Sequence, residues 1–343
     1  MKRKTVKWMS VAIALTVLAA GNVMAGGNKQ SSSGSNSSLK IGLLLPGPVN
    51  DGGWNASAFE GITEIKKKYP NAQISYQESI PPSNFEEIFR SYASQGYTMV
   101  FGHGYEFGDA AVKVAKEFPN VKFCVTSSDI TSPPNVSSLR NNYQEMGYLM
   151  GVVAATMTKS NVVGFVGGME IPSITEPFYA FEAGVKATKP SVRVISVLTG
   201  SFEDVAKAKE AALTIIEQGV DIIFQDADQS GFGVFEACRE KGVLALGSIG
   251  DQAEIAPDNI ITSGVCALSK AMVGVFDRVV DGTWGPNPYA MGAKEDAVSV
   301  APFRKFESQV PQALKDQLTK LLADMRSGAF DAVAVTEKHK ASR

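Results

Sequence analysis

The chain has 343 residues, 44% of them hydrophobic, and its 33 basic and 35 acidic side chains give a formal net charge of −2. This length is enough for two domains, and the balanced charge argues against a nucleic-acid partner or an anionic membrane surface. Three cysteines and two histidines show no zinc-ligand spacing. We therefore expect no structural metal and no cofactor.

The first 25 residues have the layout of a secretory signal peptide. Basic residues precede an apolar run from Trp8 to Ala20, and Val23 and Ala25 place small residues three and one before a break. The apolar run is shorter than the roughly 20 residues that a transmembrane helix needs. We expect cleavage after Ala25 and export to the periplasm.

Residues 26–38 are rich in Gly, Ser and Asn, which predicts a flexible tether. No cysteine precedes Cys124, so the sequence does not favour a lipid anchor and predicts a soluble periplasmic protein. Cys124 lies in a strand-like run and Cys238 in a helical one. Together with Cys266 they are expected to be buried free thiols rather than a disulfide and one odd thiol.

From Leu39 onward, short strand-like runs alternate with amphipathic helical stretches, which is typical of parallel α/β sheets. In the first block, strands are predicted at residues 40–46, 73–77, 99–102, 122–125 and 136–139, and helices at 54–69, 84–95 and 108–118. After a long helix at 144–158, the second block has strands at 162–166, 193–198, 222–224 and 244–247, and helices at 177–188, 205–218 and 231–241. A strand at 260–265 and a helix at 269–280 then lead back to the first block.

These elements predict two doubly wound parallel-sheet lobes joined by a hinge. The first lobe is expected to comprise residues 39–158 with about 267–290, and the second 159–266 with about 291–335, while residues 336–343 form a disordered tail. Two such lobes enclose a cleft at the carboxyl ends of their strands, where open α/β sheets bind ligands.

The strand-to-helix turns carry no catalytic signature. The sequence has no Walker-type phosphate loop and no Gly-x-Ser-x-Gly elbow, and in the run 102–108 the third glycine is one residue too late for a dinucleotide fingerprint. His103 follows a strand, so it is a candidate general base. A polar residue at the lip of the cleft, or a hydrogen bond to ligand, is the simpler interpretation. We predict that the chain is not an enzyme.

The first strand ends at a turn, residues 46–53, that contains a glycine pair and opens a helix at Trp54. Glycines let the backbone approach a ligand closely. A tryptophan at such a turn offers a large planar ring, which suits a flat ligand. The alternative is that Trp54 packs against its own lobe.

The segment from Asp51 through Trp54-Asn55 to Glu60-Gly61 resembles the Asp-x-x-Phe/Trp-Asn…Glu-Gly opening of the basic membrane protein family of substrate-binding proteins, which includes the purine nucleoside receptors of ABC transporters. The likeness continues, in order, at residues 157–167, 200–210, 231–235, 250–252, 256–257, 262–263 and 281–284, and spans roughly residues 39–335. The resemblance implies a monomer with a type I periplasmic-binding-protein fold that delivers a small-molecule ligand to an ABC transporter permease.

In this family the base of the ligand is stacked between aromatics of the two lobes. By position, Trp54 resembles the aromatic of the first lobe, with Asp51 and Asn55 as polar contacts, and Phe202 that of the second. Carboxylates and amides would select the edge of the ring, and Asp228, after the strand at 222–224, is the best candidate on the second lobe. The full set of candidate ligand contacts is Asp51, Trp54, Asn55, His103, Tyr105, Phe202, Asp228 and Asp251.

Two departures from the family pattern bear on the ligand. Nucleoside-binding members hold the ribose hydroxyls with an Asp and a Lys, and those positions correspond to Ile249 and Cys266. The resemblance therefore implies a purine base without ribose. A nucleoside held by other contacts, a flavin, and a sensory rather than a transport role remain alternatives.

Overall fold

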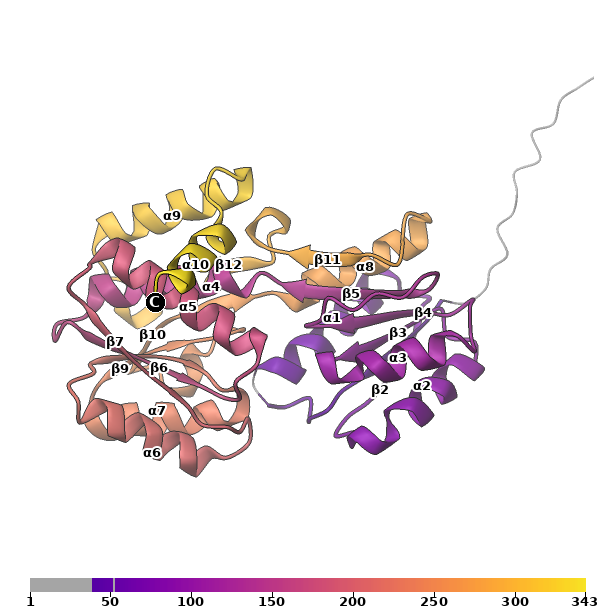
Figure 1. Ribbon diagram of the computed structural model, residues 1–343, viewed down its shortest axis with the longest axis horizontal. Coiled ribbons are helices and arrows are strands. Elements are labelled where there is room, and N and C mark those ends of the chain that lie inside the picture. Colours follow the sequence, from indigo (N-terminus) through magenta and orange to yellow (C-terminus); the bar gives the residue numbers. More distant parts are fainter. Residues whose placement is uncertain (1–38, 52) are drawn as a thin grey trace, which may run out of the picture. The chain divides into compact units, whose positions relative to one another are not determined.

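The computed structural model describes residues 39–51 and 53–343, so the expected signal peptide and tether lie outside the described residues. From residue 39 onward the chain builds two six-stranded sheets with helices on both faces of each (Figure 1). None of the helices within the described residues combines the length and apolar character needed to cross a bilayer.

The first sheet is entirely parallel, in the order β11-β5-β4-β3-β1-β2. Its strands are β1 (Lys40–Leu44), β2 (Gln73–Gln77), β3 (Met99–His103), β4 (Lys122–Thr126), β5 (Val136–Asn141) and β11 (Pro288–Met291), and its helices are α1 (Trp54–Lys68), α2 (Phe85–Ser94), α3 (Gly108–Ala115) and α8 (Leu268–Asp281). Successive residues face opposite sides, so Leu43 packs towards α1 and α8 whereas Leu44 packs towards α2 and α3. Burial on both faces explains the continuous apolar runs of these strands.

The second sheet has the order β12-β10-β9-β8-β6-β7 and is parallel except for β12, which is antiparallel to β10. Its strands are β6 (Val162–Gly167), β7 (Arg193–Leu198), β8 (Ile222–Asp226), β9 (Leu244–Gly247), β10 (Ile260–Cys266) and β12 (Val298–Val300). Its helices are α4 (Tyr143–Met157), α5 (Pro172–Thr188), α6 (Val205–Ile216), α7 (Gly231–Lys241), α9 (Gln312–Ser327) and α10 (Ala332–Ala341). Alternation again divides the core, because Phe224 packs with α4 and α5 while Ile223 packs with α6 and α7.

Short 3₁₀ helices join the longer elements. They are η1 (Pro82–Asn84), η2 (Tyr105–Phe107), η3 (Asp228–Ser230), η4 (Ala253–Ile255), η5 (Ala293–Glu295) and η6 (Arg304–Phe306). Two of them, η2 and η3, follow central strands at their carboxyl ends and bring polar residues to the position where the two lobes meet.

Helix α4 belongs to the second lobe, and its expected place in the first lobe was wrong. It packs along α5, and Gly147 and Gly151 make the approach so close that an added Cβ would lie 2.2 Å from the carbonyl oxygen of Pro177 or Phe181. Met146 of α4 shares a buried cluster with side chains of β6 and β8. Because α4 is buried along nearly all its length, its apolar pattern does not indicate which sheet it covers.

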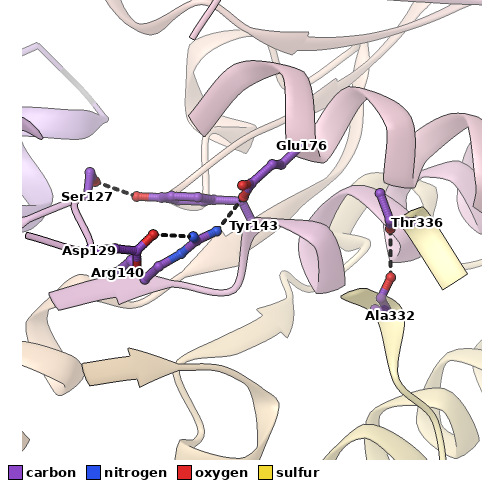
Figure 2. Close-up of polar contacts among 7 residues, drawn as sticks. All are labelled: Ser127, Asp129, Arg140, Tyr143, Glu176, Ala332 and Thr336. Atoms are coloured by element: carbon purple, nitrogen blue, oxygen red, sulfur yellow. Dashed lines mark hydrogen bonds and ion pairs between the residues drawn. The ribbon is translucent and has the colours of Figure 1, made fainter. Parts of the chain in front are cut away.

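The C-terminal residues are helical, which corrects the expected disordered tail at 336–343. Asp331 caps α10 by accepting a hydrogen bond from the Ala334 N–H at 3.0 Å. Thr336 is buried, and its hydroxyl donates to the carbonyl of Ala332 at 2.6 Å (Figure 2). Ala332 and Val335 pack into the cluster formed by α4 and α5, so apolar contacts hold this helix in place.

The chain passes between the two sheets three times, from β5 to α4, from β10 to α8 and from β11 to β12. Backbone hydrogen bonds tie these crossings together: Asn142 N–H donates to Met291 O at 2.8 Å, and Ala267 N–H donates to Ala297 O at 2.6 Å. Buried Glu145 accepts from the Ala293 N–H at 2.6 Å. These three adjacent segments are the place where a hinge between the lobes would lie.

Candidate functional site

A cavity of about 330 Å³ is lined by residues of both lobes, at the carboxyl ends of their strands. In the first lobe its walls come from the segments that follow β1, β3 and β4, and in the second from those that follow β6, β7, β8 and β9. The volume lies at the lower end of the roughly 300–1,000 Å³ found for small-molecule sites.

Asp51 lies in the cavity wall, but its carboxylate is occupied by the start of α1. Oδ1 accepts from the N–H groups of Gly53 and Ala56, both at 3.0 Å, and Oδ2 accepts from the Asn55 backbone N–H at 2.5 Å and from the Asn55 side-chain amide at 2.8 Å. A carboxylate at a helix N-terminus also interacts favourably with the helix dipole. Asp51 therefore positions this turn and has little capacity left for a ligand.

Asn55 completes the same network. Its side-chain oxygen accepts from the Gly47 N–H at 3.3 Å, while its amide nitrogen donates to Asp51. The side chain is buried and lies in the cavity wall. Both of its polar ends are thus used to join the segment after β1 to the first turn of α1.

His103 packs against the ring of Trp54 and does not lie at the lip of the cleft. The two rings are 4.3 Å apart with a 31° tilt, and His103 is fully buried and absent from the cavity wall. Its Nε2 lies 3.1 Å from the Trp54 carbonyl and its Nδ1 lies 2.7 Å from Thr126 Oγ1. Because a carbonyl only accepts, Nε2–H donates and Nδ1 accepts from the Thr126 hydroxyl. Burial lowers the pKa of His103 to about 4, so the ring is neutral.

On the second lobe, Phe202 and Asp228 lie in the cavity wall with Trp54. The Phe202 ring lies against Gly168 so closely that an added Cβ there would be 2.3 Å from Cε1. Asp228 is in the left-handed region at φ 53°, and its Oδ1 accepts from the Trp54 N–H of the first lobe at 3.4 Å. Burial, reinforced by the nearby charge of Asp51, holds the pKa of Asp228 well above its usual range.

The remaining two candidate contacts, Tyr105 and Asp251, lie at the mouth of the cavity and outside it, respectively. Tyr105 borders the cavity and is 54% exposed, so it stands at the mouth. Asp251 is exposed, forms an ion pair with Arg304 and is not part of the cavity wall, which corrects its assignment as a ligand contact. Its neighbour Gln252 does line the cavity, and its Oε1 accepts from the Ser248 N–H at 3.0 Å and from the Gln225 amide at 2.6 Å.

The two positions that suggested a ligand without ribose also differ from each other. Ile249 lines the cavity at a positive φ of 68°. Cys266 is fully buried with its Sγ 3.6 Å from Met146 Sδ, and it does not line the cavity. Only Ile249 can therefore bear on ligand choice directly. All three cysteines are buried and unpaired, as expected from the sequence.

Comparisons with known proteins identify the family of this chain. Residues 38–328 match the model of the Bmp family, described as ABC transporter substrate-binding protein PnrA-like. This chain belongs to the Bmp family. A purine-binding protein of Brucella abortus is 28% identical over 85% of this chain and 82% of its own length, and the nucleoside-binding protein BmpA of Lactococcus lactis is 33% identical over 67% of this chain and 68% of its own. A solute-binding protein of an ABC transporter system from Aeropyrum pernix aligns in structure with a TM-score of 0.77 and 19% identity, over 88% of this chain and 98% of that one.

Membership in the Bmp family confirms three predictions made from the sequence: the family itself, the type I periplasmic-binding fold and a non-catalytic role. The protein is the solute-binding component of an ABC transporter. Its buried histidine and acidic groups therefore have no catalytic role.

Sequence reasoning missed several polar residues of this Bmp-family cavity. Asp226 is the last residue of β8, and Ser248 directly follows β9; both are buried and line the cavity. Burial raises the pKa of Asp226 to about 7, against a smaller opposing effect of the Ser248 hydroxyl. The position of both residues at the carboxyl end of central strands was the signal available in the sequence.

A second, smaller cavity of about 210 Å³ adjoins the first, with which it shares Tyr105, Ser127, Tyr143, Ile171 and Ser173. Figure 2 shows its polar contacts. Ser127 Oγ and Tyr143 OH are 2.8 Å apart, and Arg140 forms ion pairs with Asp129 and with Glu176. Arg140 belongs to β5 of the first sheet and Glu176 to α5 of the second lobe, so this ion pair connects the two lobes beside the ligand cavity.

Proposed function

We propose that this Bmp-family protein is an extracytoplasmic receptor that captures a purine nucleobase between its two lobes and delivers it to an ABC transporter permease. The observation that supports the proposal most is that Trp54 of the first lobe and Phe202 of the second line one cavity. Base-aromatic stacking contributes about 1–3 kcal/mol per base. The names of the Brucella and Lactococcus relatives point to the same class of ligand.

Calorimetric titration with adenine, guanine and hypoxanthine tests the stacking role. Trp54→Ala and Phe202→Ala are each expected to weaken binding at least tenfold, with little change in the unfolding midpoint. Tyr76→Ala is the matched control, because Tyr76 is 43% exposed and does not line the cavity. Unchanged affinity in both cavity variants would contradict the stacking role, and wild-type protein that binds no purine would contradict the ligand class.

The proposal of a free base rests on Ile249. An aliphatic side chain offers ribose hydroxyls no hydrogen bond, and each unmet polar group costs about 1–3 kcal/mol. We expect adenine to compete better than adenosine, and guanine better than guanosine. Mass spectrometry of small molecules released from freshly purified, denatured protein identifies the ligand independently, and a nucleoside or a flavin there would overturn the free-base assignment.

The transport role also predicts a motion and a location. Ligand should reduce the radius of gyration in small-angle scattering, because closing the lobes about their crossings compacts the molecule, and it should raise the thermal midpoint. We further propose a monomeric periplasmic form that begins after Ala25. N-terminal sequencing of protein recovered from the periplasm of a Gram-negative host checks the cleavage.

A further inference from the structure

Arg140, in the adjoining smaller cavity, is paired with Asp129 and Glu176, and the charged side chains that line the larger cavity all have the same sign. Five carboxylic acids line it, Asp51, Glu106, Glu203, Asp226 and Asp228, and no Lys, Arg or His of the described residues does so. A cavity with acids and no basic partner disfavours an anionic ligand and favours one that donates hydrogen bonds. Nucleotides and other phosphorylated heterocycles are therefore poor candidates.

The five acids are not equivalent. Asp51 already accepts four hydrogen bonds at the start of α1, and Asp228 accepts one from the Trp54 N–H. Glu106 and Glu203 are exposed at the rim. Asp226 alone combines deep burial, with 4% of the residue exposed, and a carboxyl oxygen, Oδ2, that is buried and has no hydrogen-bond partner within the described residues.

A buried polar atom without a partner costs free energy, and a native structure that keeps one calls for an explanation. The backbone of Asp226 is fixed: its carbonyl accepts from the Gly168 N–H at 3.1 Å, and the residue ends β8 beside β6. The sheet thus fixes the backbone from which this carboxyl projects into the cavity wall. A ligand that donates an N–H group to Oδ2 would supply the missing hydrogen bond.

We propose that Asp226 determines which edge of the base is recognised, by accepting hydrogen bonds from two adjacent N–H donors such as the ring N1–H and the 2-amino group of guanine. This rests on the proposed function. A carboxylate has two oxygens side by side, which match two parallel donors, and such charge-assisted bidentate pairs are the strong ones. Hypoxanthine lacks the 2-amino group and offers one of the two donors.

The experiment compares ligands that differ by one donor. In calorimetric titration at pH 8, wild-type protein is expected to bind guanine at least tenfold more tightly than hypoxanthine, and 1-methylguanine, in which N1–H is blocked, as weakly as hypoxanthine. Guanosine monophosphate is expected not to bind. In Asp226→Asn the ratio between guanine and hypoxanthine should fall to within about threefold. Asp109→Asn, an exposed aspartate of α3 outside the cavity, should leave the ratio unchanged.

The outcomes separate this inference from the proposed function. If hypoxanthine and 1-methylguanine bind wild-type protein as tightly as guanine, Asp226 does not select the edge, although the purine proposal stands. An unchanged ratio in folded Asp226→Asn overturns the inference in the same way. If no purine binds at all, the proposed function itself fails. The ligand series on wild-type protein decides the matter even where the variant does not fold.

Discussion

The two walls of the cavity differ in how completely their polar groups are satisfied. In the first lobe, Asp51 and Asn55 are hydrogen-bonded to one another and to the backbone, and His103 uses both ring nitrogens beneath Trp54. In the second lobe, Oδ2 of Asp226 has no hydrogen-bond partner in the part of the chain that the structure describes, and Asp228 accepts its hydrogen bond from the Trp54 N–H of the first lobe. The buried polar groups Asp51, Asn55 and His103 of the first lobe are therefore satisfied without a ligand, whereas buried Asp226 of the second lobe can still accept a hydrogen bond.

This difference indicates that the two walls contribute differently to ligand binding. A wall whose hydrogen bonds are internally satisfied can hold an aromatic ring in one place, and such a preorganised surface stacks on flat ligands with little regard for their edges. A wall with unsatisfied acceptors distinguishes ligands by their donors. Changes in the first wall should lower affinity for all purines alike, and changes in the second should alter their ranking.

The largest effect is expected for Asp51→Ala. It removes the acceptor of four hydrogen bonds at the start of α1, so we expect a loss of about 2 kcal/mol in the free energy of unfolding and loss of most affinity for every purine. Thermal unfolding and calorimetry measure the two effects. Asp331→Ala removes the corresponding cap of α10, outside the cavity, and should lower stability without weakening binding. Equal losses of affinity in both variants would contradict a role of Asp51 in positioning Trp54.

Much of this architecture was predictable from the sequence, and the errors have physical causes. Apolar runs located the strands, and the carboxyl ends of those strands located the cavity. Strand alternation would also have placed His103 correctly, because Met99, Phe101 and His103 share one face of β3 and the first two pack towards α1. The carboxylate of Asp51, just before a helix, was open to interpretation as a cap as well as a ligand contact.

Other features depend on packing that the sequence does not encode locally. Helix α4 is apolar on all sides, so only its close contact with α5 shows which sheet it covers. Asp251 and Gln252 are adjacent, yet one pairs with Arg304 at the surface and the other lines the cavity. Which of two neighbours turns inward in a loop depends on backbone angles set by the whole lobe.

The buried carboxyl of Asp226 is expected to make the stability of the protein depend on pH. Burial raises the pKa of Asp226 to about 7, so between about pH 4 and 7 the folded state holds a proton that the unfolded state releases, and stability falls as pH rises through this window. Asp226→Asn should raise the unfolding midpoint by a few degrees at pH 8 and little at pH 4.5. Asp109→Asn should do neither. A midpoint unchanged at both values would contradict the unfavourable burial of this charge.

Other titratable groups near the cavity also affect how stability depends on pH. Tyr143, Cys266 and Asp228 interact with Asp226, and burial raises the pKa of all three. Tyr143 and Cys266 therefore stay neutral across the window, whereas Asp228 contributes a slope of the same sign, which the single variant leaves in place. His103 acts in the opposite direction, since its depressed pKa costs stability as pH falls from about 6.5 towards 4. Comparison of the variant with wild type at each pH cancels the contribution of His103, and it cancels the part of the Asp228 contribution that does not depend on the Asp226 charge.

A smaller effect is expected for His103→Ala. Without the imidazole, Trp54 loses the ring beneath it and the hydrogen bond to its carbonyl, so its position becomes less defined. We expect affinity for guanine and hypoxanthine to fall about tenfold each, with their ratio preserved. Calorimetry of both ligands is the measurement. A changed ratio would assign edge recognition to the first wall and contradict the inference that only the second wall ranks the purines.

The smallest effect is expected where the two walls are joined, at the ion pair between Arg140 and Glu176. The pair is partly exposed, with 24% and 21% of the side chains accessible, and pairs of this kind contribute about 1 kcal/mol or less. Because it connects the lobes, it stabilises only the arrangement in which they are in contact. Glu176→Gln should therefore raise the dissociation rate of every purine about two- to fivefold, without altering the ratio between guanine and hypoxanthine. Glu64→Gln, which breaks a pair with Lys67 within α1, is the control and should leave the rate unchanged. Stopped-flow tryptophan fluorescence measures these rates, and a Glu176→Gln rate equal to wild type would show that this contact does not hold the lobes together.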